Sequence, residues 1–190
     1  MSILANLLNR LVMATALPTP SDWWILAATF LVYSAIALPL GFSMNFLKWN
    51  PIDFHPLRLL GAMIWLFITP ALLEETLFRV LLIPPPTEAI SPLIWLFWAA
   101  FSLILFIISH PIAALTYNPA GNPTFCQTPF LSLATILGLA CTIAYTLTGS
   151  LLIPVLFHWL VVVVWLFLLD GEHKLSANLQ AKSDNLTPSS

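Results

Sequence analysis

Five long apolar runs, separated by short polar segments, dominate the chain. They cover residues 23–42, 57–83, 92–109 with a continuation towards 117, 129–147 and 151–169. Each is close to the roughly 20 residues that a helix needs to cross a bilayer. None shows the alternation of apolar and polar positions that is typical of membrane β-barrels. The pattern therefore predicts an all-α fold, a polytopic transmembrane helix bundle with five membrane helices, or six if residues 3–17 also insert.

The composition narrows the class of protein further. Hydrophobic residues fill 59% of the 190 positions and charged residues only 7%, with a mean hydropathy of +0.94, whereas soluble domains carry about 25% charged residues. Lys and Arg together number 6 and the formal net charge is −2, so no basic patch is available for nucleic acid. We expect a multi-pass integral membrane protein, in contact with the lipid bilayer of the cell membrane and without a nucleic-acid partner.

The polar segments suggest a simple organisation. We expect one membrane-embedded domain over residues 1–170, with a motif-bearing core at 57–169, and a polar, flexible tail at 171–190. Four basic residues fall on one side of the predicted bundle, namely Lys48, Arg58, Lys174 and Lys182. The opposite side has only Arg10 in its flanks. The positive-inside rule then assigns the tail and the loop at 43–56 to the cytoplasm.

The second apolar run is the one that carries charges well inside it: Glu74, Glu75 and Arg79. Charged groups in a membrane helix are costly and mark functional sites by default. Glu75 and Arg79 are four positions apart and can pair along one helix face, whereas Glu74 points about 100° away. We therefore expect one paired, structural carboxylate and one free carboxyl suited to acid–base work. Pro70 is expected to kink the helix just before them.

Two histidines lie in other apolar runs, His110 and His158. Together with Glu74 they could position and activate a water molecule, either without a cofactor or with a divalent metal such as zinc bound by Glu74, His110 and His158. The structural alternative is that these residues form a polar cluster that only joins helices through hydrogen bonds. Neither an HExxH nor a CxxC sequence occurs, so the spacing leaves the metal question open.

Three segments in order resemble the CPBP family of intramembrane proteases, which includes type II CAAX prenyl endopeptidases and bacteriocin-processing or immunity-associated homologues. The EExxxR motif of the family is matched by EETLFR at 74–79, and its FxxxH motif by FIISH at 106–110. A late histidine in a Gly-Ser-Leu…Pro…His-Trp context is matched by GSLLIPVLFHW at 149–159. The resemblance implies an all-helical intramembrane endopeptidase.

The resemblance also implies a role for each matched residue. Glu74 and His110 would activate water for attack on a peptide carbonyl, and His158 would stabilise the oxyanion. Glu75 would belong to the same catalytic set, and with Arg79 it would shape the site. Phe106 belongs to the second motif. The implied substrate is a membrane protein or peptide, and the family name suggests a prenylated one.

One position departs from the family pattern. The third motif usually continues as HxxxN, with the Asn acting as a second oxyanion donor, but the matching residue here is Val162. Loss of one such donor could cost about 2.7–4 kcal/mol of transition-state stabilisation. The alternative function is therefore a non-catalytic membrane binding or immunity protein built on the same scaffold. A small transporter would also use intramembrane Glu and His, but the internal repeats typical of transporters are not visible.

Overall fold

The computed structural model describes residues 3–53, 55–85 and 87–186, and these residues form helices without any named strand. In chain order the elements are α1 (Ile3–Ala14), α2 (Pro20–Ser43), α3 (Pro56–Leu66), η1 (Phe67–Leu72), α4 (Leu73–Glu75), η2 (Thr76–Leu81), α5 (Pro92–Leu115), η3 (Pro119–Gly121), η4 (Thr124–Cys126), α6 (Thr128–Thr148), α7 (Leu152–Leu168) and α8 (Gly171–Leu186). The elements from α3 to η2 follow one another without a break as a single helix, Pro56–Leu81. The predicted all-α polytopic bundle is confirmed.

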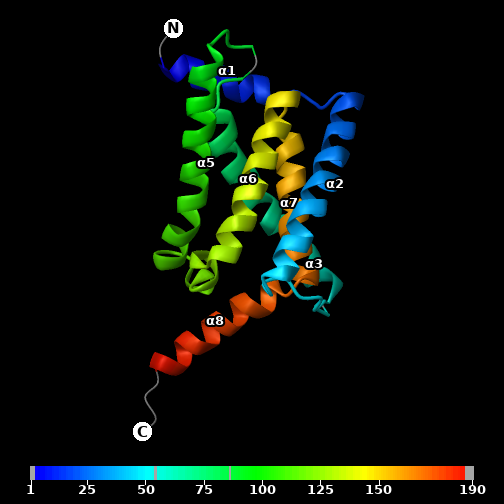
Figure 1. The fold of residues 1–190 in the computed structure, drawn as a ribbon, viewed down its shortest axis with the longest axis vertical. Coiled ribbons are helices and arrows are strands. Elements are labelled where there is room, and N and C mark those ends of the chain that lie inside the picture. The colour runs from blue at the N-terminus through cyan, green and yellow to red at the C-terminus, as the bar shows by residue number, and fades with distance from the viewer. Residues whose placement is uncertain (1–2, 54, 86, 187–190) are drawn as a thin grey trace.

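Four of these helices are long and apolar enough to cross a membrane: α2, Pro56–Leu81, α5 and α6. The fifth predicted membrane helix is α7, which is apolar but has 17 residues, about 26 Å of helix. The possible sixth membrane helix, at residues 3–17, is not among the helices long enough to cross a membrane. Helix α1 has 12 residues, about 18 Å, and lies across one end of the bundle instead of along it (Figure 1).

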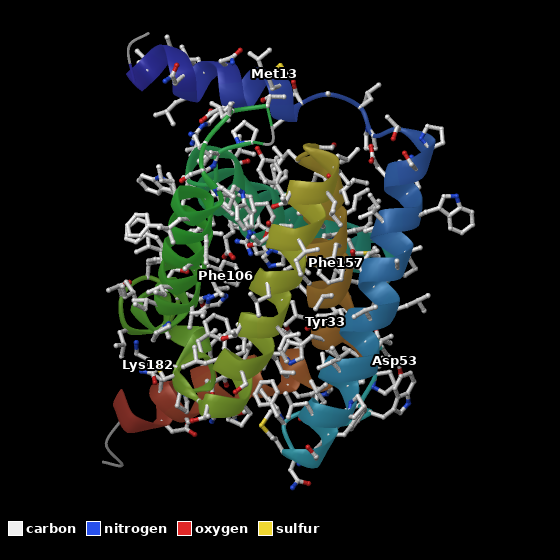
Figure 2. The ribbon with its side chains drawn as sticks, turned by 45° about the horizontal axis from the view of Figure 1, so that its top comes forward. Met13, Tyr33, Asp53, Phe106, Phe157 and Lys182 are labelled. Atoms are coloured by element: carbon white, nitrogen blue, oxygen red, sulfur yellow. The ribbon has the colours of Figure 1, made fainter. Side chains whose placement is uncertain are left out.

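Helix α6 is the central element of the bundle. Half of its apolar window is buried, against 6–17% for the other three long helices, because it packs against α2, α5 and α7. Phe106 of α5 and Phe157 of α7 are fully buried in the core cluster around α6, and Figure 2 shows both in the interior of the bundle. The large apolar side chains left exposed on α2, α3 and α5 suit contact with lipid.

The loop after α2 and the C-terminal helix lie at the same end of the bundle, opposite α1 (Figure 1). The amides of Asn50 and Ile52 donate to the carbonyls of Leu168 and Phe167, both at 3.0 Å. This shared end agrees with the expectation that the 43–56 loop and the tail are on one side. Which side of the membrane it is stays a prediction.

The polar tail expected at 171–190 is largely helical, and its flexibility stays a prediction. Residues Gly171–Leu186 form α8, which runs away from the bundle (Figure 1). Asn178 Nδ2 donates to the carbonyl of Ala120 at 2.8 Å and to Thr124 Oγ1 at 2.9 Å, so α8 is fastened to the short helices η3 and η4. Polar composition alone does not reveal such long-range contacts.

Candidate active site

The helix that carries the two glutamates is wound unevenly around them. Two π-helical turns, η1 and η2, flank the single α-helical turn α4 that contains Glu74 and Glu75. Pro70 lies inside η1; it has no N–H to donate to the ladder, so the kink expected there takes the form of a widened turn. Such π-turns are frequent at functional sites.

Glu75 lies at the centre of a fully buried ionic cluster. Its Oε1 is 2.8 Å from His158 Nδ1, and its Oε2 is 3.2 Å from Arg79 Nε. The predicted pair of Glu75 with Arg79 is therefore present. Arg79 Nη2 donates to the carbonyl of Gly138 at 2.9 Å, and its guanidinium lies 4.6 Å from the ring centre of Phe106. The cluster thus ties the Pro56–Leu81 helix to α5, α6 and α7.

Hydrogen-bond chemistry defines where the imidazole protons are. His110 Nδ1 lies 2.8 Å from the carbonyl oxygen of Phe106; a carbonyl can only accept, so Nδ1 carries the proton. The other nitrogen of a neutral His110 ring, Nε2, is then a proton acceptor. The Glu75 carboxylate is paired with the Arg79 guanidinium through one oxygen, and its other oxygen accepts a hydrogen bond from His158 Nδ1. The aromatic ring of Phe106 lies between the two imidazoles, 4.9 Å from His110 and 6.0 Å from His158.

The remaining carboxyl faces a large cavity. This cavity has a volume of about 810 Å³, and Glu74, His110, His158 and Val162 all line it. One oxygen of Glu74, Oε2, is buried and has no hydrogen-bond partner among the described residues. Glu75 does not line the cavity. The fold therefore brings together the three groups that were expected to act on water, and separates the two adjacent glutamates as the 100° rotation predicts.

The group of described residues that is close enough to share a metal ion differs from the expected one. It consists of Glu75, Cys141 and His158, whose ligand atoms all lie within 4.8 Å of one another. Glu75 is already engaged by the Arg79 guanidinium on one oxygen and by His158 on the other. A cation next to the carboxylate opposes binding of a second cation, so this group fits a metal poorly. A metal held by Glu74, His110 and His158 stays a prediction.

Several residues that shape the site carried no signal of function in the sequence. Gly138 supplies the carbonyl for Arg79, and a Cβ atom there would lie 2.7 Å from Leu103 and 3.0 Å from Phe106. A small residue in an apolar span is a known sign of close helix packing, and it is the one clue the sequence offered. Cys141 beside Glu75 could not have been found, because the contact joins two different helices.

The fold and the site together define a polytopic helical membrane protein with a buried cluster of glutamate, arginine and histidine beside a cavity. Comparison with protein-family models matches residues 56–164 to the type II CAAX prenyl endopeptidase Rce1-like family. The match covers more than half of the chain and runs from the start of α3 into α7, so it includes all three motifs. The chain belongs to this family. No curated protein and no solved structure matches the sequence.

Membership in the family establishes the general class of the protein. It is an integral membrane protein of the CAAX-type intramembrane proteases, a family whose members act on membrane-associated, prenylated proteins.

Proposed function

We propose that this protein is an intramembrane endopeptidase that hydrolyses a peptide bond of a membrane-associated, lipidated substrate. The observation that supports it most strongly is the convergence of Glu74, His110 and His158 on one cavity. A general base, a second proton acceptor and a candidate oxyanion donor are the groups that hydrolysis by an activated water requires.

Glu74 and His110 act on the water. Glu74 Oε2 has no partner among the described residues, and His110 is left with an acceptor at Nε2 because its Nδ1 proton is held by the Phe106 carbonyl. A water molecule between them gives one proton to Glu74 while its oxygen bonds to the peptide carbonyl carbon. The same proton then passes to the leaving nitrogen as the C–N bond breaks, which restores the carboxylate.

His158 stabilises the oxyanion of the tetrahedral intermediate. Its Nδ1 proton is directed at Glu75, so Nε2 can donate only if the ring is an imidazolium. Charges of −1 on Glu74 and Glu75 and +1 on Arg79 and His158 then balance within the site. Neutrality overall keeps the cost of burying these groups low, and leaves His158 as the positive group that faces the cavity.

The cavity also suits a lipid-modified substrate. Its volume of about 810 Å³ falls within the range of ligand pockets, about 300–1,000 Å³. Most of its wall is aliphatic or aromatic, with contributions from Phe30, Leu38, Phe46, Trp65 and Leu137. A prenyl chain bound there would present the adjoining peptide to the polar groups.

We propose the cell membrane as the location of the protein, which fractionation of membranes would test.

Cleavage of matched peptides tests the proposal. Purified protein is given a farnesylated peptide with a C-terminal CAAX sequence and the same peptide without the prenyl group, with and without a chelator. We expect wild type to cleave the prenylated peptide and Glu74→Gln, equally well folded, to leave it intact. Cleavage by Glu74→Gln at the wild-type rate would contradict the assignment. Equal cleavage of both peptides would contradict the prenylated substrate.

Val162 supports a second candidate function. It lines the cavity one helical turn after His158, where its side chain offers no hydrogen-bond donor. A protein that binds a membrane partner without cleaving it would need no complete oxyanion site. Folded wild-type protein that binds the prenylated peptide but leaves it intact would favour this non-catalytic binding or immunity function.

A further inference from the structure

We propose that the hydroxyl of Thr69 is the second oxyanion donor of this site, in place of the donor that Val162 cannot supply. This inference rests on the proposed endopeptidase function and concerns how the same site completes its chemistry. It starts from a polar group in the cavity wall for which no hydrogen-bond partner is found among the described residues.

Thr69 lines the same cavity as the other groups of the site. It lies in the π-helical turn η1 and lines the cavity together with Glu74, His158 and Val162. Glu74 follows in α4 and lines the same cavity. The lining positions of this helix recur every three to four residues, at Leu66, Thr69, Pro70, Leu73 and Glu74, so Thr69 and Glu74 belong to the one helix face that borders the cavity.

Thr69 also lies on the helix that packs beside Val162. The Pro56–Leu81 helix and α7 run antiparallel, because Ile52, just before the first, bonds to Phe167 at the end of the second, while Glu75 bonds to His158. Positions before Glu75 therefore pack against positions after His158, and η1 contacts α7. A donor on η1 is on the same side of His158 as Val162.

The hydroxyl of Thr69 is available. Other helical threonines of this protein donate to the carbonyl four residues earlier, as Thr76, Thr135 and Thr142 do at 2.7–2.9 Å. Within the described part of the chain, no hydrogen bond is found for the Thr69 side chain. A polar group next to an apolar cavity without a partner is unfavourable, and a developing oxyanion would satisfy it. Preorganised donors of this kind are what stabilise a tetrahedral intermediate.

Thr69→Val tests this proposal because it removes the hydroxyl and keeps the branched shape. We expect kcat for the prenylated peptide to fall about 10²–10³-fold, the loss typical of one oxyanion donor, with KM within about threefold. The unfolding midpoint should not change, since no hydrogen bond within the protein is lost. Thr76→Val is the matched control: it removes a threonine hydroxyl from the same helix away from the cavity, and kcat should stay at the wild-type level.

Two further measurements separate an oxyanion donor from a structural role. A phosphinic peptide that mimics the tetrahedral intermediate should lose affinity for Thr69→Val by the same factor as kcat/KM falls. Adding Val162→Asn to Thr69→Val should restore at least tenfold in kcat, because an amide one turn after His158 would replace the missing donor. Thr69→Ala, which also lacks the hydroxyl, takes the place of Thr69→Val if the latter folds poorly.

The outcomes are distinct. Wild type that cleaves and Thr69→Val that cleaves at the same rate would overturn the role of Thr69 and leave the proposed endopeptidase standing. A loss of kcat without any loss of affinity for the phosphinic peptide would also overturn it. Folded wild type that cleaves nothing would remove the proposed function, and the oxyanion role of Thr69 with it.

Discussion

Glu75→Gln is the substitution that most directly tests the division of roles between the two adjacent glutamates. It keeps the shape of the side chain but removes the charge that faces Arg79. The Glu75 and Arg79 side chains are both 0% exposed, and two guanidinium nitrogens of Arg79 already lack a hydrogen-bond partner among the described residues. The guanidinium would keep only the carbonyl of Gly138 and the ring of Phe106. Neither of them carries a negative charge.

The expected cost follows from this burial. Removing one partner of a buried ion pair costs about 3–5 kcal/mol, because the other charge stays buried and uncompensated. That corresponds to a ratio of folded to unfolded protein lowered roughly a hundred- to several-thousand-fold. Glu74→Gln replaces a carboxyl whose Oε2 has no partner in the described structure, so we expect a loss of about 1 kcal/mol or less.

Denaturant titration of the micelle-solubilised protein, followed by tryptophan fluorescence, measures both losses. The double variant Glu75→Gln with Arg79→Met is the control, because it removes the stranded charge as well as its partner. We expect it to recover about 1–3 kcal/mol relative to the sum of the single losses. Equal destabilisation by Glu74→Gln and Glu75→Gln, or no recovery in the double variant, would refute the assignment of Glu75 as the structural carboxylate.

Three other predictions concern the metal question and the two ends of the bundle. Cleavage should survive saturating chelator, because the one ligand set of the described residues that is close enough to share an ion, around Cys141, includes neither Glu74 nor His110 and uses a carboxylate that Arg79 already holds; loss of cleavage that zinc restores would contradict this and support a metal held by Glu74, His110 and His158. Arg10→Met should lower the unfolding free energy by about 1 kcal/mol, since Arg10 makes two hydrogen bonds, 2.7 and 2.8 Å, to the carboxylate of Glu88; an unchanged denaturant midpoint would show that this ion pair does not stabilise the packing of α1. Partial burial raises the pKa of Asp170, but hydrogen bonds from Lys174 and Asn50 outweigh it and hold the pKa below its ordinary 3.8. The stabilisation of α8 by Asp170 is therefore present above pH 3.8 and lost as the pH falls through the lowered pKa. The protection of α8 amides against hydrogen exchange should fall over this pH range in wild type. In Asp170→Asn the protection should stay the same over this range.

The sequence predicted most of the fold because membrane helices depend on local composition. The five apolar runs predicted five helices within a few residues of their bounds. The helical form of α8 was not foreseen, because its contacts are with a loop far away in the chain, and the position of α1 across the end of the bundle did not follow from the apolar stretch at 3–17. Amphipathic or polar segments are positioned by tertiary contacts that composition does not report.

The site was predictable where its geometry follows from one helix. The 100° between Glu74 and Glu75 separates them on any helix, and the four-residue step to Arg79 pairs it with Glu75. Contacts between helices could not be predicted in this way, and these include His158 with Glu75 and Thr69 in the cavity wall. The π-helical turns were also out of reach, although Pro70 marked the place where the helix deviates.

The buried cluster of Glu75, Arg79 and His158 orients side chains of the site more than it stabilises the fold. A buried ion pair usually contributes little net stability, yet this one joins three helices through Glu75, Arg79, His158 and the carbonyl of Gly138. Its specific effect is on His158: by accepting the Nδ1 proton, Glu75 fixes the ring orientation and leaves Nε2 for the cavity. Glu75→Gln with Arg79→Met should therefore remain folded yet cleave poorly, because an amide can also donate and no longer fixes which nitrogen of His158 faces the cavity. Recovery of stability together with full activity in that double variant would show that His158 needs no anionic partner.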